Sequence, residues 1–202
     1  MIEKNHIIKN DVIFDDNLTH RMWWKRTWDE NKPQACVIML NPCSSDTIVA
    51  DTTTTIVVNN IARFEEFGGV TIVNLFSYIT TKLDFKDAHD VDFNDYSNDN
   101  FIKKAAEEAS VVILAWGKSA DTNARIYHRA EQVLKLLKGQ KDKFRVIRAG
   151  DRLGIHPLTP QARKEWILEE IDEWLKQTKE SARKREEKER AQLAALNGAK
   201  AD

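Results

Sequence analysis

Four short apolar runs, each ended by polar or turn-forming residues, constrain the fold of this 202-residue chain more than any other feature. They span residues 35–40, 70–76, 111–116 and 144–147. Runs of this length that are apolar on both faces are typical of strands buried on both sides of a sheet. Segments with apolar residues at helical spacing separate them, at residues 54–67, 100–110 and 124–138. This alternation predicts an α/β fold in three layers, α/β/α, with a mostly parallel central sheet.

The two ends of the chain follow different patterns. In the first thirty residues tryptophans alternate with cations, and we expect an edge segment whose Trp23 and Trp24 cover the core while Arg21 and Arg26 stay in water. Stacking of these aromatics on bases is the alternative. After Pro160, apolar residues at helical spacing predict one long helix. We therefore expect a single domain over residues 1–175 and a charged helical or disordered tail over 176–202, with a phosphate-binding arm as the alternative.

Composition excludes several classes of protein. A net charge of −1 argues against a chain that coats nucleic acid nonspecifically, although a local basic groove remains compatible with it. No apolar run is long enough to span a bilayer, and polar residues interrupt the N-terminal segment, so we expect a cytoplasmic protein without membrane contact. Cys36 and Cys43 are too few for a disulfide framework or a cysteine metal site. We expect a monomer that uses no metal and no cofactor.

Polar residues gather where the predicted strands end. Residues 41–46 (Asn-Pro-Cys-Ser-Ser-Asp) follow the first run, Asn74 lies in the second, residues 116–119 (Trp-Gly-Lys-Ser) end the third, and residues 156–160 (His-Pro-Leu-Thr-Pro) follow the fourth. Ligands of open parallel sheets bind beyond the carboxyl ends of the strands. The sequence therefore predicts one pocket that contains Asn41, Asn74 and His156.

Asn74 is the least expected of these residues, because asparagine disfavours strand interiors and a buried amide must be satisfied. It either bonds to neighbouring backbone or reads the edge of a pyrimidine, whose donors and acceptors one amide can match in two places.

The order of these motifs resembles a bacterial and phage family known as the domain of unknown function DUF1643. The likeness covers roughly residues 20–165 and rests on four motifs: Leu40-Asn41-Pro42, Val73-Asn74-Leu75, Ala115-Trp116-Gly117 and His156-Pro157-Leu158. The family's acidic-Pro-Thr element is present as Asp51-Thr52-Thr53 without its proline, and its Asn-Asp pair as Asn98-Asp99.

More distantly, the same skeleton is similar to the uracil-DNA glycosylase superfamily, which implies a uracil-DNA-glycosylase-like fold and cleavage of a base–sugar bond. That resemblance implies that Asn41 positions water, Asn74 reads the base and His156 stabilises the leaving base. If the water needs a general base, Asp46 and Asp51 are the nearest carboxylates, and helix capping is their alternative role.

Departures from the glycosylase pattern indicate a different substrate. Strict uracil enzymes carry a tyrosine after the first-motif proline, whereas small residues follow Pro42 here, and an open pocket suits a bulky 5-substituent. We therefore expect a DNA glycosylase that flips and excises a modified pyrimidine, such as hydroxymethylated or glucosylated cytosine, in anti-phage defence. The substrate-binding candidates are Asn74, Pro42, Cys43, Ser44, Ser45, Asp51 and Phe76, and the DNA-binding candidates are Lys118, Ser119, Leu158 and Thr159.

In the last motif Leu158 replaces a serine, so a phosphate-binding hydroxyl is missing unless Thr159 substitutes, and Leu158 is also a candidate apolar wedge. Three alternatives remain open: a non-catalytic module that binds a modified base or nucleotide, an enzyme of free nucleosides, and a glycosylase that repairs uracil or damage.

Overall fold

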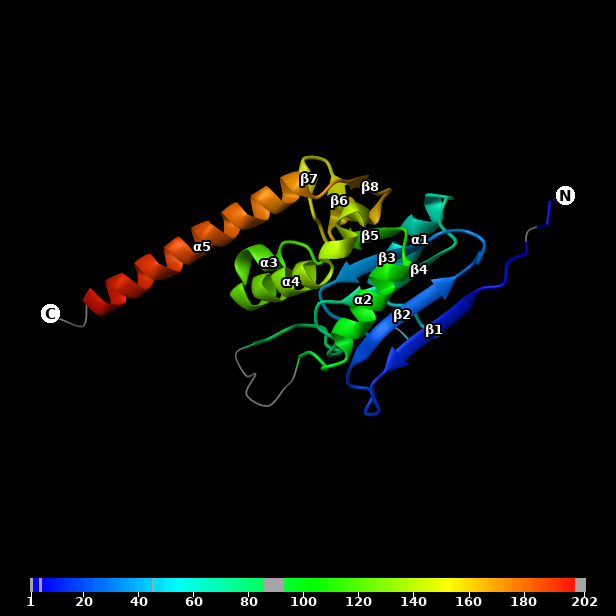
Figure 1. Cartoon of the computed structure of the whole chain (residues 1–202), viewed down its shortest axis with the longest axis horizontal. Helices are drawn as coiled ribbons and strands as arrows, with labels where there is room; N and C mark the ends of the chain where they lie inside the picture. The colour runs from blue at the N-terminus through cyan, green and yellow to red at the C-terminus, as the bar shows by residue number, and fades with distance from the viewer. Residues whose placement is uncertain (1, 4, 45, 86–92, 199–202) are drawn as a thin grey trace.

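The computed structural model describes residues 2–3, 5–44, 46–85 and 93–198 (Figure 1). In these residues eight strands form one sheet: β1 (Lys9–Phe14), β2 (Arg21–Thr27), β3 (Gln34–Met39), β4 (Gly69–Asn74), β5 (Val111–Leu114), β6 (Phe144–Ala149), β7 (Arg152–Leu153) and β8 (Ile167–Glu169). The helices are α1 (Thr52–Arg63), α2 (Asn98–Glu108), α3 (Ser119–Thr122), α4 (Ala124–Leu136) and α5 (Asp172–Gly198), with 3-10 helices η1 (Lys138–Lys143) and η2 (Pro160–Arg163).

The centre of the sheet is parallel. Strands β4, β3, β5 and β6 lie side by side in this order and run in the same direction. All four predicted strands are therefore confirmed. In-register pairing places Met39 beside Asn74, so β3 and β4 end at the same edge of the sheet. Polar segments that follow these strands consequently meet at that edge.

The sheet as a whole is mixed, and the expectation of a mostly parallel sheet is wrong. Four of the seven strand pairings in the described chain are antiparallel: β1–β2, β2–β4, β6–β7 and β6–β8. Short connections explain two of them, because a parallel neighbour requires a long crossover. Between β1 and β2 the Asp15 carboxylate closes the turn by accepting from the Thr19 and His20 amides, and between β6 and β7 Gly150 turns the chain with φ at +60°.

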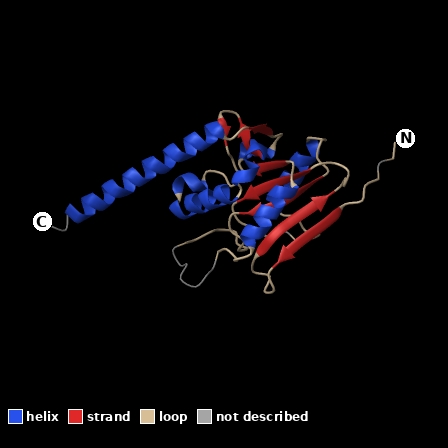
Figure 2. Cartoon of the chain, in the orientation of Figure 1, coloured by secondary structure: helices blue, strands red, loops and turns tan. Residues whose placement is uncertain are grey.

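Helices cover both faces of the sheet (Figure 2). On one face α2 and α4 bury Ile102, Ile126 and Val133 against the strands, and Trp174 at the start of α5 joins the same cluster. On the other face α1 buries Val57 and Ile61. The predicted α/β class is confirmed.

The N-terminal segment contributes an inner strand rather than an edge with wet arginines. Strand β2 lies between β1 and β4, and Trp24 is fully buried. Arg21 is only 1% exposed, so the expectation that it stays in water is wrong. Arg26, which was also expected to stay in water, is half-buried: its guanidinium stacks over the Trp24 ring, and its Nε donates to Asn10 Oδ1. The added strand β1 explains the difference, because it covers a segment that would otherwise form the edge.

The C-terminal region is not one helix after Pro160. Residues 167–169 form β8, which pairs with β6, and the long helix begins only at Asp172. Tertiary contacts override the helical spacing here: the Trp166 amide donates to Asn60 Oδ1 and its indole to the Ala162 carbonyl. Helix α5 is continuous from Asp172 to Gly198, so the expected boundary at residue 175 falls inside a helix.

Candidate functional site

A cleft of about 460 Å³ lies beyond the carboxyl ends of β3 and β5. Six segments line it: the start of β2, the loop after β3, the N-terminus of α1, and the loops that follow β4, β5 and β7. The lining residues are Arg21, Met39, Leu40, Asn41, Cys43, Asp51, Thr52, Thr53, Thr80, Thr81, Trp116, Gly117, Lys118, Ser119, His156 and Leu158. Its location agrees with the rule for open α/β sheets.

Asn41 lies in this cleft and is fixed by the main chain. Its side-chain Nδ2 donates to the Thr80 carbonyl at 2.6 Å and to the Pro42 carbonyl at 3.1 Å. With both amide protons directed at backbone, the Oδ1 atom is the group that remains to accept a hydrogen bond from a ligand or a water. The asparagine therefore joins the β3 loop to the Thr80 loop and offers the cleft an acceptor.

His156 is the imidazole of the cleft. Its Nδ1 accepts from the Leu158 amide at 3.1 Å, so in the neutral ring the proton is on Nε2. Burial lowers the pKa of His156 below its ordinary value, and the Asp51 carboxylate opposes this shift. At neutral pH the ring is consequently a neutral donor through Nε2.

Gly117 permits this position of the histidine. Its φ is +73°, and a Cβ placed on it would lie 2.8 Å from the Cβ of His156. Two chain segments that are far apart in sequence thus touch at a point where only glycine fits.

Asp51 combines the two roles considered for it. Its Oδ1 accepts from the Thr54 amide at 2.7 Å and caps α1, and the residue also lines the cleft. The negative charge of Asp51 interacts with both Arg21 and His156. Asp46 is different, because it does not line the cleft and its Oδ1 accepts from the Ile48 and Val49 amides. The structure places Asp46 in a turn rather than in the site.

Arg21 is a buried cation of the cleft, and Asn74 lies behind it. The Arg21 Nη2 donates to Asn74 Oδ1 at 3.4 Å, and Asn74 is 1% exposed and does not line the cleft. Burial lowers the pKa of Arg21 to about 10, while Asp51 and Cys43 raise it. The guanidinium therefore remains charged at neutral pH. The predicted trio of Asn41, Asn74 and His156 is thus only partly brought together, since Arg21 stands between Asn74 and the cavity.

The remaining candidates divide into two groups. Cys43, Lys118, Ser119 and Leu158 line the cleft, whereas Pro42 and Phe76 are buried beside it and Ser44 and Thr159 lie outside its lining. Thr159 instead donates its amide to the His156 carbonyl and so shapes the histidine loop. Ser45 lies outside the described residues.

The sequence interpretation missed Arg21 and four threonines of the lining, Thr52, Thr53, Thr80 and Thr81. The threonines at 52 and 53 had a signal, because they follow Asp51 at a helix start where polar groups are expected. Arg21 had none, since an arginine at the start of an aromatic segment is typical of the surface.

Comparison with protein families agrees with the resemblance seen in the sequence. The model of a family described as a protein of unknown function (DUF1643) matches residues 21–158. The chain belongs to the DUF1643 family. All residues that line the cleft lie within the matched region, and α5 lies beyond it. No curated protein and no solved structure matches the chain.

The DUF1643 motif Asn98-Asp99 lies outside the cleft and supports it from behind. Asn98 Nδ2 donates to the Asn74 carbonyl at 3.1 Å, and Arg129 Nε donates to the Leu75 carbonyl at 2.7 Å. Asp99 forms an ion pair with Arg129. These side chains hold the end of β4 in place, so the motif is structural.

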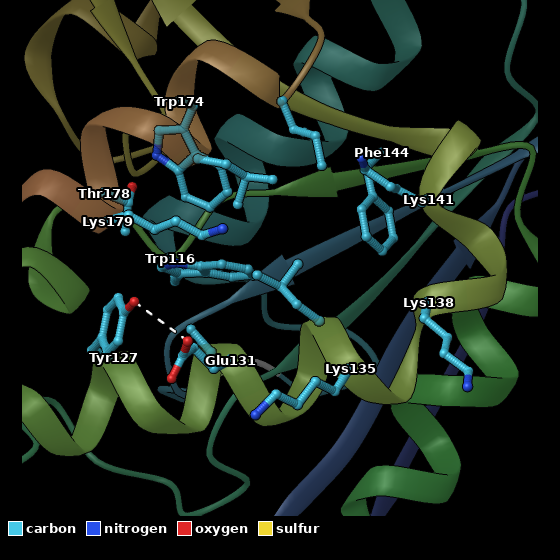
Figure 3. A pocket seen from close by; sticks show the side chains of 14 residues that line it. Trp116, Tyr127, Glu131, Lys135, Lys138, Lys141, Phe144, Trp174, Thr178 and Lys179 are labelled. Atoms are coloured by element: carbon cyan, nitrogen blue, oxygen red, sulfur yellow. Dashed lines mark hydrogen bonds between the residues drawn. The ribbon is translucent and has the colours of Figure 1, made fainter. Parts of the chain in front are cut away.

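A second cavity, of about 530 Å³, lies between α4 and the start of α5, against the DUF1643 region (Figure 3). Trp116 lines both cavities and forms the wall between them. The Trp174 ring packs against Trp116 with 5.5 Å between centroids. Helix α5 therefore contacts a wall of the cleft although it lies outside the family match.

Within the described part of the chain, no cluster of histidine, cysteine and carboxylate side chains is placed to bind a metal ion. Likewise, none of the described helices has the length and apolar character that crossing a membrane requires.

Proposed function

We propose that this protein hydrolyses the N-glycosidic bond of a 5-substituted pyrimidine in DNA, such as hydroxymethylated or glucosylated cytosine. The bond between the sugar C1′ and the base nitrogen breaks, its electron pair leaves with the base, and water adds to C1′. Action on phage DNA that carries such bases would serve defence. The similarity in motif order to the uracil-DNA glycosylase superfamily supports this assignment of the fold and chemistry.

The observation that carries the proposal is the hydrogen bond from the Leu158 amide to His156 Nδ1, which leaves the proton of the neutral ring on Nε2. The Leu158 amide occupies Nδ1, so Nε2–H is the donor available to a ligand in the cleft. Negative charge grows on the departing base, and a fixed donor in a water-poor site stabilises charge where it develops. A neutral imidazole is suited to this step because it keeps its Nε2 proton and donates a hydrogen bond to the base as negative charge develops on it.

Asn41 and Asp51 are suited to the sugar side of the reaction. Asn41 Oδ1 can hold the attacking water, because its amide protons are already bound to backbone carbonyls. The Asp51 carboxylate lines the same cleft, and its negative charge stabilises the positive sugar of an oxocarbenium-like transition state. It is also the acceptor we propose for the proton that water loses. Asp46 is not proposed for this role, since its carboxylate binds its own turn.

Arg21 takes the part of base reader that the sequence suggested for Asn74. The guanidinium offers donors to the carbonyl and ring nitrogen of a pyrimidine, and Asn74 Oδ1 holds it from behind. Its positive charge also favours the anionic leaving base. Asn74 then acts as a positioning residue.

The shape of the cleft favours a substituted base. Its volume of about 460 Å³ falls within the range of about 300–1,000 Å³ that is usual for small-molecule pockets. The side chains of Cys43, Thr52, Thr53 and Thr81 are small, and threonine hydroxyls can bond to a hydroxylated substituent such as a hexose.

The test is incubation of the full-length protein with DNA that contains uracil, hydroxymethylcytosine or glucosylated hydroxymethylcytosine, followed by alkali to cleave abasic sites. We expect strand cleavage with a 5-substituted cytosine and a loss of about 10²–10³-fold in rate for His156→Ala. Absence of cleavage with all three substrates at stoichiometric protein would refute the proposal.

One observation favours a second function, a module that binds a modified base without cleaving it. Asp51 carries the only carboxylate among the described lining residues. Its Oδ1 already accepts the hydrogen bond that caps α1. A pure binder retains selective affinity for the modified base but shows no abasic product, with or without His156. An enzyme instead loses turnover in His156→Ala and keeps its affinity within about threefold.

A further inference from the structure

Two large aliphatic side chains are exposed beside the cleft. Ile48 is 85% exposed and Val49 is 64% exposed. They lie in the loop between Cys43 and Asp51, both of which line the cavity. Another adjacent pair of exposed aliphatic residues, Ile7 and Ile8, lies near the N-terminus and does not line the cleft, so the place of Ile48 and Val49 beside the cleft distinguishes them.

Hydrogen bonds fix the turn that carries Ile48 and Val49. Asp46 Oδ1 accepts from the Ile48 amide at 2.8 Å and from the Val49 amide at 3.3 Å, and the Asp46 amide donates to the Val49 carbonyl at 2.9 Å. The Trp24 indole, which is fully buried in β2, donates to the Asp46 carbonyl at 2.7 Å. The two side chains thus stand on a turn that is closed on itself and tied to the core.

We propose that Ile48 and Val49 form an apolar wedge that enters the base stack of duplex DNA and fills the gap left by the nucleotide held in the cleft. The wedge rests on the proposed function and specifies its substrate as duplex DNA. Proteins that open a base step insert apolar side chains of this kind, and the unstacked step is stabilised by the contact.

The size and place of the pair favour DNA over a protein partner. Two aliphatic side chains match the dimensions of one base step, whereas a stable protein interface buries about 800 Å² on each partner. The turn is continuous with the cleft, and Lys118, a cation of the same rim, can contact a phosphate. The Asp46 carboxylate accepts hydrogen bonds from the Ile48 and Val49 amides of the same turn, which lowers its repulsion of the DNA backbone.

The test compares the full-length protein with Ile48→Ala/Val49→Ala on three labelled oligonucleotides of one sequence. These are a duplex with a tetrahydrofuran abasic analogue, the intact duplex, and the single strand with the same analogue. Ile7→Ala/Ile8→Ala is the matched control, because both residues are exposed and lie near the N-terminus, which Figure 1 shows at the right of the molecule, well away from α3.

We expect the unaltered protein and the control to bind the abasic duplex at least about tenfold more tightly than the intact duplex. The Ile48→Ala/Val49→Ala variant loses this preference and keeps its affinity for the single strand. A variant that retains the preference, or that loses single-strand binding as well, overturns the wedge. Failure of the unaltered protein to bind any of the three oligonucleotides overturns the proposed function instead.

Discussion

At the scale of single residues, the neighbours of His156 decide how its ring titrates. Burial lowers its pKa below the ordinary value of 6.5, although Asp51 acts in the opposite direction. The unfolded chain therefore takes up a proton at higher pH than the folded one. Between 6.5 and the lower folded pKa, stability falls as the pH falls, by at most about 1.4 kcal/mol per pH unit.

Substitution of His156→Gln should remove this contribution. We predict that the free energy of unfolding, measured in urea at pH 7.5 and 5.5, decreases less on acidification in the variant than in the unaltered protein. The other histidines are present in both proteins and cancel in the comparison. An identical pH dependence would show that His156 is not buried in its neutral form.

Alanine substitutions at Gly117 and Gly150 distinguish the effect of backbone strain from the effect of contact with His156. Both have a positive φ, but a Cβ on Gly117 meets His156, whereas a Cβ on Gly150 has nothing within 4 Å. We predict that Gly117→Ala and Gly150→Ala each lose about 1–2 kcal/mol of stability from the left-handed backbone, and that Gly117→Ala loses more because its Cβ would clash with His156. Only Gly117→Ala should also lose most of the turnover in the assay of the proposed glycosylase activity. Equal turnover in the two variants would contradict the close approach of the two loops.

The sequence predicted which residues lie in the cleft better than it predicted how they are arranged there. The polar ends of the strands indicated Asn41, Lys118, Ser119 and His156, and the cleft contains them. The contact between Arg21 and Asn74 was not predictable, because it depends on the pairing of β2 with β4, two strands that are far apart in the sequence. Such a contact is a property of the assembled sheet, which local patterns do not encode.

At the scale of secondary structure, α5 braces two segments of the cleft. Trp174 packs on Trp116, and a Cβ added to Gly154 would lie 2.0 Å from the Trp174 indole nitrogen, so the histidine loop passes close against this helix. About three turns after Trp174, Arg185 Nη1 donates to the Ala120 carbonyl at 3.1 Å and to the Asp121 carbonyl at 3.3 Å. Both acceptors belong to α3, whose first residue lines the cleft.

Removal of this brace should affect stability and activity together. We predict that Arg185→Ala loses about 1.5–3 kcal/mol, because carbonyls bonded to a charged donor lose their partner. Arg183→Ala is the matched control: Arg183 is 70% exposed and pairs with Glu187 one turn later, so its loss costs at most about 1 kcal/mol. Urea unfolding and the abasic-site assay measure both effects. Equal losses in the two variants would show that α5 does not support the cleft.

The strands that the sequence missed lie outside the parallel centre of the sheet. Strand β2 combines two tryptophans with three cations, and β8 has only three residues, so neither shows the apolar run of a central strand. Their pairing with β4 and β6 decides their structure. The four central strands were predictable because both of their faces are buried and their sequences are correspondingly apolar.

At the scale of the whole molecule, the parallel core determines where the chemistry lies. The antiparallel additions make the sheet mixed without moving the carboxyl ends of β3 and β5, at which the cleft opens. The rule that ligands bind at the carboxyl ends of parallel strands therefore applies to the parallel centre of the sheet, although the sheet as a whole is mixed.

The most direct test of the account is mass spectrometry of the bases released from phage genomic DNA that contains glucosylated hydroxymethylcytosine, with unmodified DNA as the comparison. The account predicts that the protein releases the free modified base, that His156→Ala releases at least about 10²-fold less, and that unmodified cytosine stays in the DNA. Release of no base from the modified genome at stoichiometric protein would contradict the assignment of the cleft as a glycosylase site.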